Sequence, residues 1–242
     1  MSPARRTLAA LAALLALALP AAADEPPEGR KPRDAAELRY WLQNAVGHHR
    51  YSAAEAADAL AMSEPEVRAA LEKFAIRPGK TPPRAKDAPL LVLPYPGGRH
   101  PRIGFLEGAI RPQRETKLSV FTPWDPASYV VADVPEAIWS NLGLIYLAHT
   151  HIPTVWDQQK VRLPRLEWNR RDDGTFDIER KLPNGIAFAV KVRPGRDAVR
   201  FEMTLTNGTD QRLSDLRVQN CVMLKGAAGF AAQTNANKVF EA

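Results

Sequence analysis

The sequence contains almost no cysteine, no long apolar run and no block of like charge. Cys221 is the only cysteine among 242 residues, which excludes an intramolecular disulfide and leaves the core to hold the fold together. The apolar stretch at residues 8–19 is shorter than the roughly 20 residues that a membrane-spanning helix needs. Acidic and basic residues are interspersed, so we expect no patch for nucleic acid or for a membrane surface.

The first 23 residues have the pattern of a cleaved export signal. Arg5 and Arg6 form its basic start, residues 8–19 its apolar centre, and the alanines at 21–23 its cleavage site. Cleavage there lowers the formal net charge from +6 to +4, because two arginines are lost. We therefore expect an exported protein, periplasmic or extracellular, with no stable membrane span; an uncleaved anchor is the alternative. Residues 24–33 are Pro-rich and charged, which predicts a flexible lead-in.

Residues 34–76 predict a small module of three helices. Ser52 with Glu55, and Ser63 with Glu66, have the spacing of capping boxes at the starts of the second and third helices. This helix pair resembles a helix-turn-helix, and DNA binding through residues 51–75 is one interpretation. Acidic residues offset the basic ones on the third helix, so we instead expect a packing or docking module that could hold a protein partner.

Residues 77–89 form a Pro-rich linker, and residues 90–242 predict one antiparallel β-sandwich. Short β-branched and aromatic runs alternate with turn sequences such as Asp173-Gly174, Asn184-Gly185 and Asn207-Gly208, which are strong hairpin signals. Residues 135–143 are predicted as one short helix between strands, with proline at its start and glycine past its end. The closing segment "QTNANKVF" reads like the approach to another strand, so a sandwich truncated at its C-terminus is one interpretation. The fold class is thus mainly β, with a helical module in front.

The stretch "VRFEMTLTNGTDQRLSDLRVQNCVML" resembles the exported bacterial β-sandwiches of the galactose-mutarotase-like type. "PYPGGRHPRIGFLEG" and "QNCVMLKGAAGF" are also similar to an uncharacterised exported bacterial family. The mutarotase-like resemblance implies sugar binding on a concave sheet, with a histidine and a carboxylate as acid and base in the enzymes of that type. No position of this sequence can be matched to those catalytic residues.

His149 and His151 are the first candidates for a functional site. In a strand over residues 144–152 they point to the same face, roughly 6.5–7 Å apart, a spacing that suits one divalent metal ion such as zinc or iron. A metal site needs a further ligand. The candidates for that ligand are His100, Glu107, Glu115 and Asp157. Hydrogen-bonded histidines at the end of a central strand, and a sugar-contacting pair without metal, are the alternatives.

Four tryptophans fall within the predicted sandwich. Trp139 is expected in the core, whereas Trp124 and Trp156 lie beside aspartates and are expected to be exposed, where they could stack on sugar rings. Two carboxylate pairs, Glu107 with Glu115 and Asp125 with Asp133, could serve glycoside hydrolysis if each pair lay about 5–10 Å apart. There is no Gly-x-Ser-x-Gly elbow and no phosphate-binding loop. Cys221 is expected to be a buried small residue.

These observations leave two main hypotheses for function. The first is an exported, non-catalytic binding or envelope-associated protein whose sandwich contacts carbohydrate. The second is a carbohydrate-active or metal-dependent enzyme centred on His149 and His151. A third ligand beside the histidines would favour the enzyme, and a concave sheet without one would favour binding.

Overall fold

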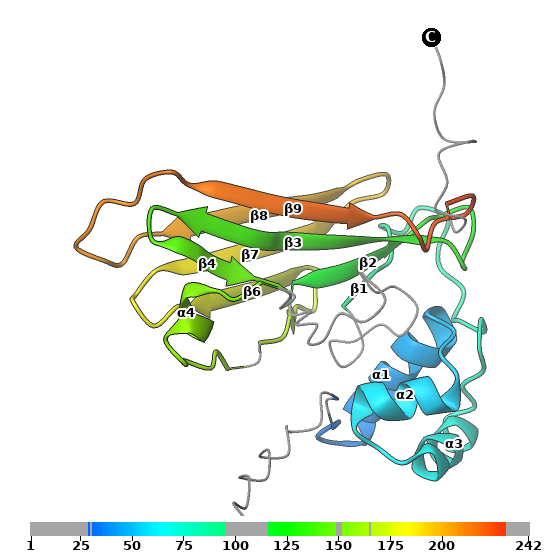
Figure 1. Ribbon diagram of the computed structural model, residues 1–242. Helices are drawn as coiled ribbons and strands as arrows, with labels where there is room; N and C mark the ends of the chain where they lie inside the picture. The colour runs from blue at the N-terminus through cyan, green and yellow to red at the C-terminus, as the bar shows by residue number, and fades with distance from the viewer. Residues whose placement is uncertain (1–28, 30, 95–115, 149–151, 165, 231–242) are drawn as a thin grey trace, which may run out of the picture.

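The computed structural model describes residues 29, 31–94, 116–148, 152–164 and 166–230, and it shows a small helical module followed by two antiparallel β-sheets (Figure 1). The prediction of a mainly β chain, with an antiparallel sandwich behind a helical module, is confirmed. The predicted signal peptide, residues 1–23, lies outside the described residues, as does the segment 233–240 that suggested a further strand.

The helical module has its own caps and its own core. Its helices are α1 (Ala35–Leu42), a π-helical continuation (Gln43–His48), α2 (Ala53–Leu60) and α3 (Glu64–Lys73). Both predicted capping boxes are present, so the first backbone N–H groups of α2 and α3 are satisfied locally. The buried apolar residues include Trp41, Leu42, Val46, Tyr51, Leu60 and Val67.

The first sheet, named the β3 sheet, is organised around one long strand. It contains β1 (Val92–Pro94), β2 (Lys117–Phe121), β3 (Tyr129–Ser140), β4 (Gly143–Leu147) and β9 (Arg217–Met223). The first half of β3 pairs with β2 and the second half with β4, while β9 pairs with both halves. β3 is therefore the strand through which the other elements of this sheet are joined.

The second sheet, named the β7 sheet, is a simple meander. Its strands are β5 (Asn169–Arg170), β6 (Phe176–Lys181), β7 (Ala187–Pro194) and β8 (Val199–Thr206), paired in that order. Gly174 and Gly185 have φ values of +79° and +92°, so the predicted turns use the left-handed conformation that glycine adopts without strain. The predicted alternation in β8 is confirmed, since Phe201 is half-buried and its neighbours Arg200 and Glu202 are exposed.

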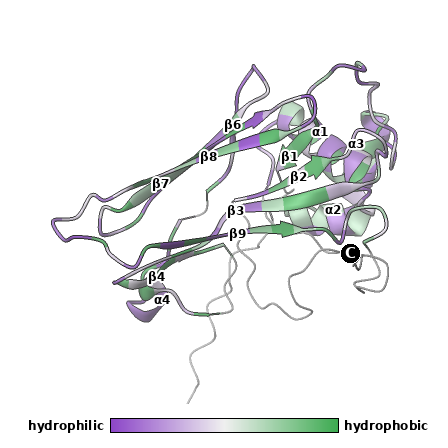
Figure 2. Cartoon of the chain, turned by 90° about the horizontal axis from the view of Figure 1, so that it is seen from above, coloured by the Kyte–Doolittle hydropathy of each residue, from purple (hydrophilic) through white to green (hydrophobic). Residues whose placement is uncertain are grey.

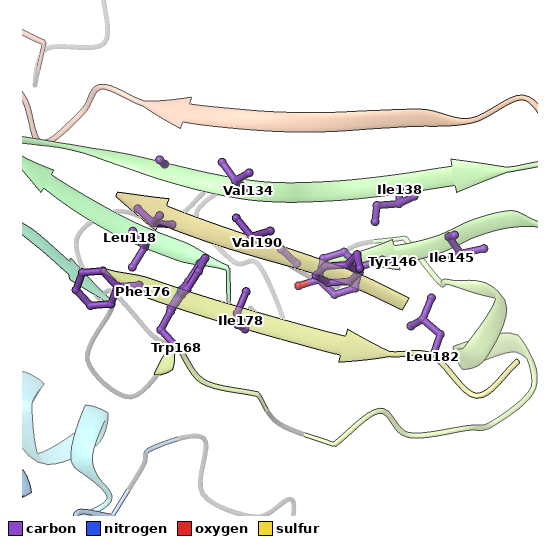
Figure 3. Close-up of a cluster of buried hydrophobic side chains, with 14 of the residues drawn as sticks. Leu118, Val134, Ile138, Ile145, Tyr146, Trp168, Phe176, Ile178, Leu182 and Val190 are labelled. Carbon is purple, nitrogen blue, oxygen red and sulfur yellow. The ribbon is translucent and has the colours of Figure 1, made fainter. Parts of the chain in front are cut away.

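The main core lies between the two sheets, where their inward-facing side chains meet (Figure 3). Tyr146 of β4 contacts Phe188 of β7 edge-to-face, with ring centroids 4.6 Å apart. The helix α4 (Val155–Gln158) closes the core near β4, because Trp156 packs into it. The other large members include Leu118, Ile138, Ile145, Trp168, Phe176, Ile178, Leu182 and Val190.

The helix predicted at residues 135–143 is wrong, because β3 continues through this segment to Ser140. Ala137 and Ile138 pair with β4 on one side and with β9 on the other, so two ladders override the local helix signals. Pro135 follows a cis peptide bond and falls where the register of β3 against β9 shifts, a position at which its missing N–H costs no ladder bond.

One further strand prediction needs correction. The strand expected over 144–152 ends at Leu147, and Ile152 is exposed. Among the described strands β4 pairs only with β3, so it is an edge strand rather than a central one. Its two faces are buried all the same, because α4 and the β7 sheet cover them.

The helical module is docked against the outer face of the β3 sheet, below β1 and β2 in Figure 1. The His49 Nδ1–H donates to the carbonyl oxygen of Asn44 at 2.9 Å, so in the neutral ring Nε2 accepts from the Ser119 hydroxyl at 2.7 Å. Asn44 in turn donates to the carbonyl oxygen of Pro94 at 2.8 Å. The His49 ring also contacts Phe121 and Tyr129, with centroids 5.1 and 5.2 Å away. The module and the sheet thus share a small buried interface.

Candidate functional site

The residues that the sequence suggested for a metal site are mostly outside the described part of the chain. His149, His151, His100, Glu107 and Glu115 all lie there. Within the ranges that the structure describes, no group of three or more His, Cys, Asp or Glu side chains could hold a metal ion.

Asp157 is described, and its carboxylate caps a helix. Its Oδ2 accepts from the backbone N–H and the hydroxyl of Thr154, at 2.8 and 2.7 Å. This is the capping box of α4. The role of Asp157 is therefore accounted for by local structure, because a carboxylate at the first turn satisfies N–H groups that have no partner within the helix.

Two of the three expectations for the tryptophans are wrong, and the third is confirmed. Trp156 was expected to be exposed, but it is only 4% exposed because it packs into the core and donates its Nε1–H to the carbonyl oxygen of Ile145. Trp139 was expected in the core, but it is half-buried outside it, with the Arg217 guanidinium 5.9 Å from its ring centroid. Trp124 is 78% exposed, as predicted, in the loop between β2 and β3.

A cluster of buried polar residues lies where β2 and β3 pair, and sequence reasoning missed it. Asp133 is fully buried and accepts from Lys117 Nζ and from the Thr116 hydroxyl, the latter at 2.5 Å. Thr116 is also 3.0 Å from the carbonyl oxygen of Pro135. The expected Asp125–Asp133 pair is not formed, because Asp125 caps its own turn at the N–H of Ala127. The only signal for the cluster is a lysine and an aspartate in otherwise apolar strands.

The same region contains a β-bulge that brings in a second carboxylate. From Asp133 to Ala137 the chain of β3 advances four residues while its partners on β9 advance two. Glu136, inside this bulge, is 3% exposed and accepts from Gln219 at 2.5 Å. Burial, together with Glu136 and Asp133, raises the pKa of the half-buried Cys221, so its thiol is protonated at neutral pH and is a poor nucleophile.

The bulge is hydrogen-bonded to two residues that adjoin predicted metal ligands in the sequence. The Ala148 N–H donates to the carbonyl oxygen of Glu136 at 2.7 Å, and Ala148 directly precedes His149 in the sequence. The Val134 N–H donates to the carbonyl oxygen of Thr116 at 3.4 Å, and Thr116 directly follows Glu115. Bulges often occur next to active sites, where they redirect side chains. The bulge therefore contains two buried carboxylates and is hydrogen-bonded to Ala148, the residue before His149.

The outer face of the β7 sheet carries a shallow, charged groove of about 350 Å³. Ala189 has a small side chain between longer neighbours and lies at the groove between Glu179 of β6 and Lys191 of its own strand. The charged and polar residues that line it are Arg171, Asp173, Thr175, Asp177, Glu179, Lys191 and Arg193.

The carboxylates of this groove are held by hydrogen bonds. Asp177 accepts from the Arg171 guanidinium and from the Asn169 amide, and the bond from Arg171 is the main reason why the pKa of Asp177 is lowered. The pKa of Asp173 is lowered because its carboxylate accepts from the hydroxyl and the N–H of Thr175. Both carboxylates are therefore ionised at neutral pH and are ready to accept hydrogen bonds.

The surface of α3 gives little support to DNA binding. The Arg68 guanidinium forms an ion pair with Glu64, one turn earlier on the same helix. This pair neutralises a cation that would have to contact phosphate. None of the described helices has the length and the apolar character that a membrane crossing requires.

Comparison of the chain with protein-family models, with curated proteins and with solved structures found no match. The groove of the β7 sheet and the bulge of the β3 sheet are therefore the two features of the described residues that bear on function.

Proposed function

We propose that this protein is an exported, non-catalytic binding protein that contacts carbohydrate through the groove on the outer face of the β7 sheet. The observation that carries this proposal is the groove itself, which is lined by both cations and carboxylates and has the small Ala189 among them. A sugar presents hydroxyl groups that both donate and accept, so a mixture of acceptors and donors suits it better than a patch of one sign.

The groove has the rigidity that a binding site of this kind needs. Glu179, Ala189 and Lys191 lie on strands β6 and β7, which are paired over six residue positions. Because the side chains stand on paired strands, little conformational entropy is lost when a ligand binds. Trp124 does not line this groove, so any stacking on that ring would occur at a separate place.

Binding of a panel of immobilised neutral and uronic-acid-containing oligosaccharides to the purified protein tests the proposal. Lys191→Ala should weaken binding of the recognised glycan about tenfold, because it removes a charged donor from the groove. Lys181→Ala is the matched control, since Lys181 is exposed on β6 of the same sheet and does not line the groove. Equal binding by both variants and the parent would contradict a role for the groove.

A second candidate function is a carbohydrate-active or metal-dependent enzyme centred on His149 and His151. The bulge favours it, because Asp133 and Glu136 are buried carboxylates and Ala148 joins the bulge to His149. The metal content of the purified protein distinguishes the two functions. About one equivalent of zinc or iron in the parent, lost in His149→Ala/His151→Ala, would support the enzyme. A parent without metal, and a variant that binds glycan as well as the parent does, would support the binding protein.

The exported location is part of the proposal and has a direct test. The N-terminal sequence of the protein recovered from its natural host should begin at Asp24, outside the cytoplasm. A cytoplasmic protein that retains Met1 would overturn this part of the proposal and reopen the question of the docking partner of the helical module.

A further inference from the structure

The strand β9 has a free edge and an exposed apolar row. Among the described strands it pairs only with β3. Apolar residues occupy every second position except that of Asn220, and their exposed fractions are 40–59%. They are Leu216, Val218, Val222 and Leu224. Figure 2 looks down on the edge of the sandwich at which β9 and β8 lie. An exposed strand edge with apolar side chains is a template for pairing with another strand.

The sequence of β9 is symmetric about Asn220. At two-residue spacing it reads Leu, Val, Asn, Val, Leu from position 216 to position 224. The strand itself, Arg217–Met223, is centred on the same residue. The residues just beyond the row, Asp215 and Lys225, carry opposite charges. An antiparallel copy of such a strand, turned about a two-fold axis at Asn220, is complementary to the original.

Along the apolar row, each contact in that arrangement joins residues of matching character. Val218 would lie opposite Val222 of a second copy, and Leu216 opposite Leu224 of that copy. Just beyond the strand, Asp215 would lie opposite Lys225, and each of these three contacts would occur twice by symmetry. Directly opposed side chains in an antiparallel pair interact most strongly, and opposite charges there are favourable. The pattern therefore fits a second copy of this chain better than an arbitrary strand.

The edge also lacks the usual features that prevent pairing. Natural edge strands are commonly protected by proline, by inward-pointing charges or by lysines. After Arg217, its first residue, the strand has no proline and no charged residue. On β8, at the edge of the other sheet, Arg200 and Glu202 are exposed.

We propose that β9 is a dimerisation strand, which pairs antiparallel with β9 of a second copy about a two-fold axis through Asn220. The interface is isologous, so it closes at two copies and does not extend into a fibre. The area that a ladder of seven residues buries is small compared with the roughly 800 Å² per partner of a stable interface. We therefore expect a dissociation constant on the order of micromolar or weaker.

Cysteine cross-linking of the purified full chain tests the register. In a Cys221→Ser background, Asn220→Cys should give a disulfide-linked dimer under mild oxidation, because the two cysteines would face each other directly. Directly opposed residues have Cα atoms about 4.5–5.5 Å apart, within the range that a disulfide spans. Val218→Cys in the same background is the matched control: it lies in the same exposed row, and its symmetry mate would be roughly 14 Å away along the strand.

A mixture of two variants sharpens this test. Val218→Cys mixed with Val222→Cys should form the mixed dimer, whereas neither alone should cross-link above background. Equal cross-linking of every cysteine variant would mean non-specific association, and no cross-linking with a monomer at all concentrations in sedimentation would mean no dimer. Either result would overturn the proposal.

A charge swap gives a second readout that needs no cysteine. Asp215→Lys would place lysines opposite each other and should weaken self-association several-fold. Adding Lys225→Asp restores opposite charges at both ends and should recover it. If the double variant associates no better than the single one, the two residues do not meet and the register is wrong. Glycan binding at the β7 sheet is on a different surface, so this proposal and the proposed function can fail independently.

Discussion

A pair of charged residues is buried on the outer face of the β3 sheet, whereas those on the outer face of the β7 sheet are exposed or partly exposed. On the β3 sheet, Lys117 and Asp133 are buried and form an ion pair. On the β7 sheet, Asp177 forms a partly exposed pair with Arg171, and Lys191 is exposed. The strands β6 and β7 alternate between more buried and more exposed residues, whereas β2 and β3 are buried along nearly their whole length.

The difference follows from what packs on each face. The helical module covers Ser119 and Phe121 on the β3 sheet through His49, and Lys117 and Asp133 lie on the same face as these two. No described element covers the groove of the β7 sheet. Buried charges need their partners to offset desolvation, whereas exposed ones are hydrated and free to meet a ligand. The covered face thus has a role in stability, and the open face is the better candidate for binding.

Removing one charge from each face should give the largest contrast. Asp133→Asn should destabilise the protein by about 3–5 kcal/mol, because Lys117 would remain buried without its counter-charge. Asp177→Asn should cost far less, because exposed ion pairs contribute little. Denaturant unfolding of the two variants beside the parent measures both. Equal losses of stability would contradict the contrast between the faces.

A double variant separates the charge from the shape of the site. Lys117→Met/Asp133→Leu replaces the buried pair by apolar groups of similar volume and should regain most of the stability lost in Asp133→Asn. If it is no more stable than the single variant, the cost arises from packing or from the lost bond to Thr116.

His49→Ala should remove the main link between the helical module and the β3 sheet. It would leave the Ser119 hydroxyl and the Asn44 carbonyl without their bonds to the ring and open a gap beside Phe121, so we expect a loss of about 2–4 kcal/mol. Limited proteolysis within residues 77–89 should become faster as the module detaches. His48→Ala is the neighbouring comparison: its ring also contacts Phe121, with centroids 5.7 Å apart, but Ser119 bonds to His49, so the loss should be smaller. An equal effect there would show that His49 has no special role.

The pH dependence of stability should report the burial of His48. Burial, with a smaller contribution from Arg84, lowers the pKa of His48 from 6.5 to about 4. Between these values the unfolded chain binds a proton that the folded chain does not, so stability is full above about pH 6.5 and falls as the pH falls toward 4. The parent should therefore lose a few degrees more in Tm between pH 7.5 and 5 than His48→Gln does. Parallel losses would mean that His48 is not the group responsible.

Trp124→Ala should have the smallest effect on stability. The ring is 78% exposed, so its removal should change the free energy of unfolding by less than about 0.5 kcal/mol. The same variant, tested against the glycan panel, shows whether the ring contributes to binding apart from the groove. A large loss of stability would mean that the ring is covered in solution.

Much of the fold was predictable because the signals were local. The capping boxes of α2 and α3, the glycine turns of the β7 sheet and the alternation in β8 each depend on neighbours in the sequence. The segment 135–143 was not predictable in this way. Its helix-like ends were outweighed by pairing with β4, the next strand, and with β9, whose Val218 lies 80 positions after its partner Ile138.

The residues of the candidate site also divide into those whose environment is set by neighbours in the sequence and those whose environment is set by distant segments. The exposure of Trp124 was predictable from the charged and Pro-rich turn around it, but the burial of Trp156 was not, because it depends on a core built from distant strands. The pairing of Lys117 with Asp133, and of His49 with Ser119, joins residues 16 and 70 positions apart. Such contacts require the register between strands and the docking of the module.

By itself the sequence determined a cysteine-poor chain with a capped helical module, a series of short antiparallel strands and a symmetric apolar row in β9, because composition, caps, turns and alternation are properties of adjacent residues. Only the tertiary structure decided that β3 runs through Pro135, that one outer face is covered while the other carries an open groove, and that the row of β9 is exposed. Burial is a property of what lies on top of a residue, and that is decided by segments far away in the chain.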